Sequence, residues 1–247
     1  MTIGSIKENS WSSRLQSVRQ RIDAAARQAG RSPNAVRLLA VSKTFPATDV
    51  ELARAAGQLA FGENYIQEGV EKIAALQGEA GDIEWHCIGP IQSNKTRLVA
   101  EHFDWVQTID RLKIAQRLND HRPANLPPLN VCIQVNIDGG ATKSGVNPEA
   151  ADALAEAVLG MPNLRLRGLM CIPDPQPNWQ TQCEVFRRAR HLYELWLARG
   201  WPMDTLSMGM SADLEAAVAS GSTMVRVGSA LFGQRGVPVE TDQPFQA

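Results

Sequence analysis

Residues 130–136, Asn-Val-Cys-Ile-Gln-Val-Asn, decide the predicted fold of this chain. The run is short, apolar and rich in Val and Ile, which is typical of a buried strand. Asn147-Pro148 comes next, a helix-capping residue followed by a proline at the first helical position, and predicts that a helix follows the strand. A buried strand followed by a helix is the repeating unit of a parallel sheet covered on both faces.

The same alternation recurs along the chain. It begins with a helix whose apolar residues Trp11 to Ala25 are spaced four and three apart. The other predicted strands are 37–42, 59–62, 83–88, 103–107, 164–170, 203–206 and 224–227. The other predicted helices are 47–56, 66–76, one after Ser93, 110–118, 179–199 and one after Ser211.

Eight short apolar strands separated by helices predict a (β/α)8 TIM barrel, in a chain near the typical length of about 250 residues. We expect one barrel domain over residues 1–247. The stretch of about 20 residues after Val227 has no helical period, so we expect the opening helix to supply the packing of a final helix.

The composition excludes several classes of protein. With 25 Lys and Arg against 26 Asp and Glu, the net charge of −1 predicts neither a nucleic-acid surface nor a polybasic membrane patch. The start of the chain lacks the apolar core of a signal peptide, and no later window reaches the roughly 20 apolar residues of a membrane span. The four cysteines form no metal-binding spacing, and we expect reduced, buried thiols and a cytoplasmic protein.

Lys43 is the most informative single residue, because active sites of such barrels lie at the carboxyl ends of the strands and Lys43 follows the first strand. A partly desolvated lysine amine can attack a carbonyl carbon and form a Schiff base. The alternative is a lysine that extends to solvent from the strand end.

The last two strands end in small residues. Ser207 to Ser211 follow the seventh strand, and Gly228-Ser229 follow the eighth. These loops of the barrel often bind phosphate, although tight turns alone also need glycine. Arg226 lies between two valines and requires a partner, either a ligand acceptor or a carboxylate such as Glu63 or Glu84. A carbonyl for Lys43, a phosphate for the two loops and an acceptor for Arg226 together describe pyridoxal 5′-phosphate.

Several motifs, in order from about residue 11 to 235, resemble those of the pyridoxal phosphate homeostasis proteins, also called the YggS or PROSC family. The motifs are Ala-Val-Ser-Lys-Thr (40–44), Phe-Gly-Glu-Asn-Tyr-Ile-Gln-Glu (61–68), Trp-His-Cys-Ile-Gly-Pro-Ile-Gln-Ser-Asn-Lys (85–95), Lys-Ser-Gly-Val (143–146), Arg-Gly-Leu-Met (167–170), Leu-Ser-Met-Gly-Met-Ser-Ala-Asp (206–213) and Val-Arg-Val-Gly-Ser-Ala-Leu-Phe-Gly (225–233).

The resemblance implies a barrel like the N-terminal domain of alanine racemase, with pyridoxal phosphate bound through a Schiff base to Lys43. It implies Arg226 as partner of the ring nitrogen and places the other cofactor-binding positions at Asn64, His86, Asn136, Met170, Ser207, Ser211, Gly228 and Ser229. Phe45 departs from the family, since many members carry a second lysine at that position.

The family implies a cofactor carrier or buffer without substantial turnover, so we predict no catalytic and no metal-binding residues. The expected partners are pyridoxal phosphate and apo forms of enzymes that use it, and we expect a monomer. The chain also ends before the second domain of alanine racemases, which supplies a catalytic tyrosine, and this favours holding over turnover.

Two other classes remain open: an amino-acid racemase or lyase that uses pyridoxal phosphate, and a phosphate-binding barrel enzyme without it, such as a sugar-phosphate isomerase. Lys143, in the loop after the fifth strand, is either a transient acceptor for the cofactor or an ordinary solvated lysine.

Overall fold

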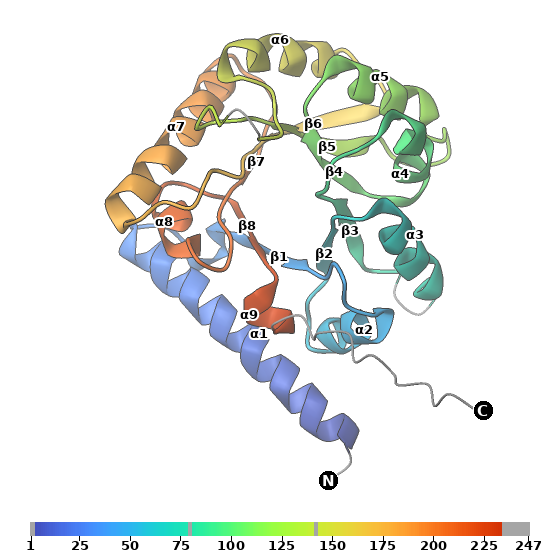
Figure 1. Ribbon diagram of the computed structural model, residues 1–247, viewed down its shortest axis with the longest axis vertical. Helices are drawn as coiled ribbons and strands as arrows, with labels where there is room; N and C mark the ends of the chain where they lie inside the picture. The colour runs from blue at the N-terminus through green and yellow to red at the C-terminus, as the bar shows by residue number, and fades with distance from the viewer. Residues whose placement is uncertain (1–2, 79–80, 141–142, 234–247) are drawn as a thin grey trace, which may run out of the picture.

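The computed structural model describes residues 3–78, 81–140 and 143–233, and these form a closed barrel of eight parallel strands in the order β1 to β8 (Figure 1). The helices lie around the barrel, and α1 crosses beside α8 and α9. The predicted (β/α)8 fold is confirmed.

The strands lie within two residues of their predicted positions at both ends. They are β1 (Arg37–Val41), β2 (Ala60–Glu63), β3 (Glu84–Cys87), β4 (Trp105–Ile109), β5 (Leu129–Gln134), β6 (Leu164–Met170), β7 (Thr205–Ser207) and β8 (Met224–Val227). The helices are α1 (Ile3–Gln28), α2 (Ala47–Ala55), α3 (Ile66–Ala75), α4 (Thr96–His102), α5 (Leu112–His121), α6 (Pro148–Leu159), α7 (Trp179–Ala198), α8 (Leu214–Ala219) and α9 (Ser229–Phe232), with 3-10 turns at Pro33–Ala35 and Ser93–Lys95.

The helix predicted after Ser211 is present as α8, and the last two helices differ from expectation in detail. The helix expected from Ser211 begins at Leu214, because Asp213 Oδ1 accepts the backbone N–H of Met210 at 2.6 Å and closes a turn before the helix. A short helix, α9, follows β8 where no helical period was seen, and four residues are too few for a period to show.

The opening helix does supply packing near the end of the chain. It contacts α2, α8 and α9. Trp11 of α1 packs edge-on against Phe232 of α9, with ring centroids 4.6 Å apart, and Phe45 packs on the same ring at 4.9 Å. Phe45 therefore joins the turn after β1 to the final helix.

A bulge in β6 decides which residues face the barrel interior. Val131 of β5 pairs with Leu166, but the next residue, Cys132, pairs with Gly168, so β6 carries one extra residue, Arg167. An extra residue reverses the alternation of side chains. Leu166 accordingly packs outside the barrel, while Met170, four residues on, packs inside it with Cys132.

No helix in the described part of the chain combines the length and apolarity that crossing a bilayer requires.

We expect Gly168→Ala to lower the free energy of unfolding by more than about 3 kcal/mol, because Gly168 has a φ of 150° and an added Cβ would lie 1.8 Å from the carbonyl oxygen of Thr205. Chemical denaturation measures the change. The matched control is Gly160→Ala, whose Cβ meets nothing closer than 3.6 Å and which should leave stability within about 1 kcal/mol. Equal stability of the two variants would contradict the role of the bulge.

Candidate cofactor site at the carboxyl ends of the strands

Lys43 lies in the turn that follows β1, two residues after Val41, and is half-buried. The next residue, Thr44, has a φ of 69°, a left-handed conformation that residues other than glycine seldom adopt. Glu68 accepts the backbone N–H of Thr44 at 2.5 Å and so holds this conformation. Strained backbone that is held by surrounding bonds is frequent at functional sites.

A buried ion cluster fixes the backbone on the other side of Lys43. Lys72 is 5% exposed and donates to the carbonyl oxygen of Ser42 at 2.7 Å, to Glu63 at 2.8 Å and to Glu68 at 2.6 Å. Burial raises the pKa of Glu63, although Lys72 and Ser42 act against this shift. The three donors of the Lys72 ammonium group are thus engaged, and the residues on both sides of Lys43 are held in place.

Arg226, on β8, is a cation buried inside the barrel with 4% of its surface exposed. Its Nη1 donates to Ser207 Oγ at 2.8 Å and its Nη2 to the carbonyl oxygen of Cys171 at 2.9 Å. Glu63 and Glu84 bind other cations, and no carboxylate among the described residues forms an ion pair with Arg226. Burial lowers the pKa of the Arg226 guanidinium, and the charge of Asp213, which forms no ion pair with it, acts only partly against this shift.

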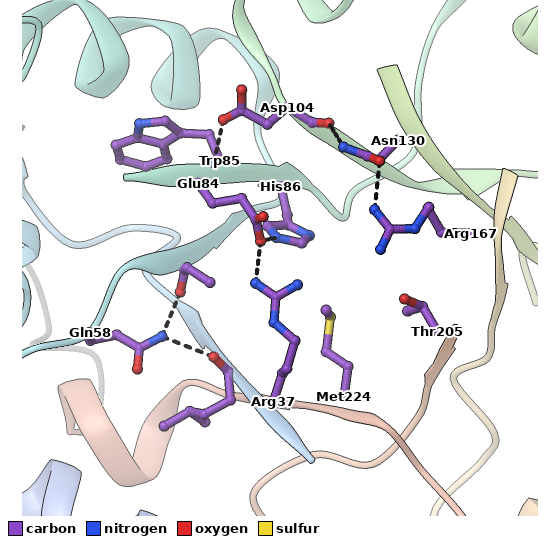
Figure 2. A network of polar contacts seen from close by, with 12 residues as sticks. Arg37, Gln58, Glu84, Trp85, His86, Asp104, Asn130, Arg167, Thr205 and Met224 are labelled. Carbon is purple, nitrogen blue, oxygen red and sulfur yellow. Dashed lines mark hydrogen bonds and ion pairs between the residues drawn. The ribbon is translucent and has the colours of Figure 1, made fainter. Parts of the chain in front are cut away.

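A chain of side-chain hydrogen bonds continues from Ser207 through the barrel. Ser207 Oγ lies 2.6 Å from Gln107 Oε1, and Gln107 Nε2 lies 2.9 Å from His86 Nδ1. His86 Nε2 lies 2.7 Å from Glu84 Oε1, which also accepts from Arg37 at 2.6 Å. Figure 2 shows the lower part of this chain, with Glu84 between His86 and Arg37.

Two residues expected to line the cofactor pocket are fully buried in this structure. His86 is fully buried, its ring stacks on Trp105 at 5.0 Å between centroids, and both of its ring nitrogens are engaged within the chain of bonds. Met170 is fully buried and packs with Trp105 and Cys132.

Asn64 and Asn136 present buried acceptors at the carboxyl ends of β2 and β5. The Oδ1 atom of each is buried and has no hydrogen-bond donor among the described residues. Asn136 uses its Nδ2 to bind the carbonyl oxygen of Gly140 at 2.8 Å, and Asn64 borders a cavity of about 260 Å³. Buried acceptors of this kind mark places where a bound group completes the hydrogen bonding.

The loops after β7 and β8 lie side by side, since the backbone N–H of Arg226 donates to the carbonyl oxygen of Gly209 at 3.0 Å. Gly209 has a φ of 96°, and a Cβ there would lie 2.4 Å from that of Ala217, so the first loop requires glycine. Ser211 and Gly228 are half-buried and Ser229 is exposed. A Cβ on Gly228 would lie 3.3 Å from the carbonyl oxygen of Val41, so small residues keep this corner open near β1.

Lys143 borders the same cavity as Asn64, but its ammonium group is engaged. Its Nζ lies 2.8 Å from Asp174 Oδ1 and 3.3 Å from the carbonyl oxygen of Ile172. The preceding loop residues 141–142 lie outside the described part of the chain.

These groups fit pyridoxal phosphate. A half-buried lysine provides an amine for the aldehyde, a buried guanidinium provides a donor and a positive charge, and loops of small residues leave room for a phosphate group. Reasoning from the sequence missed Gln107 and the Lys72 cluster. The signal for both was present, a polar residue within an apolar strand and a lysine within an apolar helix face.

Comparisons with known proteins agree with this geometry. Residues 13–236 match the family described as alanine racemase, N-terminal domain. An alanine racemase of Clostridium difficile is 13% identical with a TM-score of 0.72, over 93% of this chain and 58% of that one, which is a likeness of fold. The solved structure of PipY from Synechococcus elongatus with pyridoxal phosphate bound is 37% identical with a TM-score of 0.78, over 90% of this chain and 100% of that one.

The curated relatives are closer in sequence. The pyridoxal phosphate homeostasis protein of Escherichia coli is 57% identical over 90% of this chain and 95% of its own. That of Pseudomonas aeruginosa is 58% identical over 90% of this chain and 94% of its own. This chain therefore belongs to the pyridoxal phosphate homeostasis protein family.

Proposed function

We propose that this protein binds pyridoxal 5′-phosphate through a Schiff base to Lys43 and carries or buffers the cofactor without substantial turnover. The buried guanidinium of Arg226 is the observation that carries the proposal, because it forms no ion pair with a carboxylate of the described chain. A buried cation of this kind is unfavourable unless a ligand completes its interactions. Bound pyridoxal phosphate supplies an electrophilic aldehyde, a ring nitrogen acceptor and a phosphate anion.

In this proposal Lys43 provides the amine and Arg226 faces the ring nitrogen. Ser211, Gly228 and Ser229 bind the phosphate with backbone and hydroxyl groups, and Ser207 supports Arg226 from 2.8 Å. The remaining proposed pocket residues are Asn64, Asn136, Met170 and His86, of which His86 is fully buried.

Two features support holding the cofactor over turnover. A guanidinium donor at the ring nitrogen leaves that nitrogen without a proton of its own, which weakens the ring as an electron sink. The sequence has two tyrosines, Tyr65 and Tyr193. Tyr193 lies buried on α7, where burial raises its pKa to about 12, so it is poorly placed to act as an acid or base at the barrel mouth.

The same proposal covers partners and location. We infer a cytoplasmic monomer that releases the cofactor to apo forms of enzymes that use it. The buried, free thiols of Cys87, Cys132, Cys171 and Cys183 are consistent with a reducing compartment.

We expect Lys43→Ala to abolish the absorption band of a Schiff base, because the amine that forms the bond is removed. Treatment of the wild type with borohydride should attach the cofactor to the peptide that contains Lys43, as mass spectrometry can detect. Lys143→Ala is the matched control, a second lysine of the barrel mouth, and should keep the band. A band retained in Lys43→Ala would assign the bond to another lysine.

We expect Arg226→Met to change stability and binding in opposite directions. Removing a buried charge that lacks an ion-pair partner should raise the free energy of unfolding of the protein without cofactor by about 1 kcal/mol or more. The dissociation constant for pyridoxal phosphate should rise by at least about tenfold, since a charged donor is lost. Denaturation and absorbance titration measure the two effects. A variant that is less stable but binds equally well would show that Arg226 is structural.

The carrier role itself predicts transfer without chemistry. The loaded protein should restore activity to the apo form of an enzyme that uses pyridoxal phosphate. It should not accelerate exchange of the α-proton of amino acids with deuterated water beyond the rate given by free cofactor, as measured by NMR. Rapid exchange that disappears in Lys43→Ala would instead establish a racemase or lyase.

A further inference from the structure

The hydrogen-bond chain inside the barrel joins its two ends. Arg226 and Ser207 stand at the carboxyl ends of β8 and β7, whereas Glu84 and Arg37 are the first residues of β3 and β1. Gln107, fully buried on β4, lies between the two groups. Because each link is a hydrogen-bond contact of 2.6 to 2.9 Å, the donor or acceptor role of one member restricts the role of the next.

The upper end of the hydrogen-bond chain starts at an obligatory donor. A guanidinium donates hydrogen bonds and cannot accept them, so Ser207 Oγ accepts from Arg226. The hydroxyl hydrogen of Ser207 is then available for Gln107 Oε1, which lies 2.6 Å away. With Oε1 as the acceptor of this hydrogen, Gln107 turns its Nε2 toward His86.

The lower end gives the same direction independently. Burial alone would raise the pKa of Glu84, but the hydrogen bonds from His86 and Arg37 and the charge of Arg37 act against it, and the pKa is lowered to about 2. The carboxylate therefore only accepts, and His86 Nε2 donates to it. Burial lowers the pKa of His86 despite Glu84, which favours a neutral ring. Its Nδ1 is then an acceptor for Gln107 Nε2.

The neutral ring of His86 thus requires the Nε2 of Gln107 as its donor, and the contact between Ser207 and Gln107 Oε1 fits the same orientation of the amide. We propose that Gln107 is a positioning residue for Arg226: through Ser207 it holds the guanidinium in the orientation that meets the cofactor, without placing a negative charge beside it. The inference rests on the proposed function, because it concerns the same cofactor. It also assigns His86 to the chain of hydrogen bonds, so that His86 affects the cofactor through Gln107.

A neutral amide suits this position better than a charged group. A carboxylate at position 107 would also accept from Ser207, but it would compensate part of the charge of Arg226 that the ligand needs. A hydrocarbon side chain would leave the Ser207 hydroxyl and His86 Nδ1 without their partner. Gln107 Nε2 also lies 3.2 Å from the sulfur atom of Met224, which further limits rotation of the amide.

Gln107→Met tests the proposal, because it keeps the volume of the side chain and removes its polar atoms. We expect the dissociation constant for pyridoxal phosphate to rise about five- to tenfold, with a shifted absorption maximum of the bound cofactor. In a Ser207→Ala background the same substitution should change the dissociation constant by less than about twofold, since the chain is already broken there.

Gln58→Met is the matched control. Gln58 is 4% exposed, and its Nε2 binds the carbonyl oxygens of Leu38 and Ala60 at 2.9 and 2.8 Å, outside the chain to Arg226 (Figure 2). It should lower stability but leave the dissociation constant and the spectrum of the bound cofactor unchanged.

The outcomes separate the two proposals. Wild-type binding with an unchanged constant and spectrum in Gln107→Met, or equal effects of that substitution with and without Ser207, would overturn the positioning role and leave the proposed function intact. A wild-type protein that forms no Schiff base would overturn both.

Discussion

The buried charge of Arg226 is the constraint on which the rest of the barrel interior depends. A guanidinium with 4% exposure must be hydrogen-bonded, yet a carboxylate beside it would occupy the charge that a ligand would otherwise use. The protein meets both requirements with two uncharged acceptors for Arg226, the Ser207 hydroxyl and the Cys171 carbonyl group. The buried or half-buried carboxylates of Glu63 and Glu84 are bound by Lys72 and Arg37 instead. The interior therefore keeps a positive site at the barrel mouth at the expense of stability.

Supporting this arrangement requires both ends of the barrel. The carboxylate of Glu84 sits at the amino end, paired with Arg37 and far enough from Arg226 that three neutral side chains separate them. The bulge in β6 also shapes the interior. Because the register of β6 shifts at Arg167, Met170 packs inside the barrel with Trp105 and Cys132, while Leu169 and Cys171 pack in the outer core.

The strands, Lys43 and Arg226 were predictable from the sequence because each depends on local pattern. A short apolar run shows a buried strand, and a charge inside or just after such a run shows a site. The direction and partners of polar side chains are not local. Ser207 and Gln107 are 100 residues apart, and whether His86 faces the cofactor or the barrel interior depends on strand register and depth. The short helix α9 and the bulge in β6 were also not predicted, since a helix of four residues or one extra residue in a strand leaves no periodic signal in the sequence.

Carboxylates bind two further lysines near the carboxyl ends of the strands. Lys72 donates to Ser42, Glu63 and Glu68, and Lys143 is paired with Asp174. For either amine to attack an aldehyde, it would first have to leave these carboxylates, and for Lys72 the buried Glu63 would lose its cation. The Lys72 cluster instead holds the strained turn at Thr44, so the ion pairs that restrain one lysine also present Lys43 to the barrel mouth.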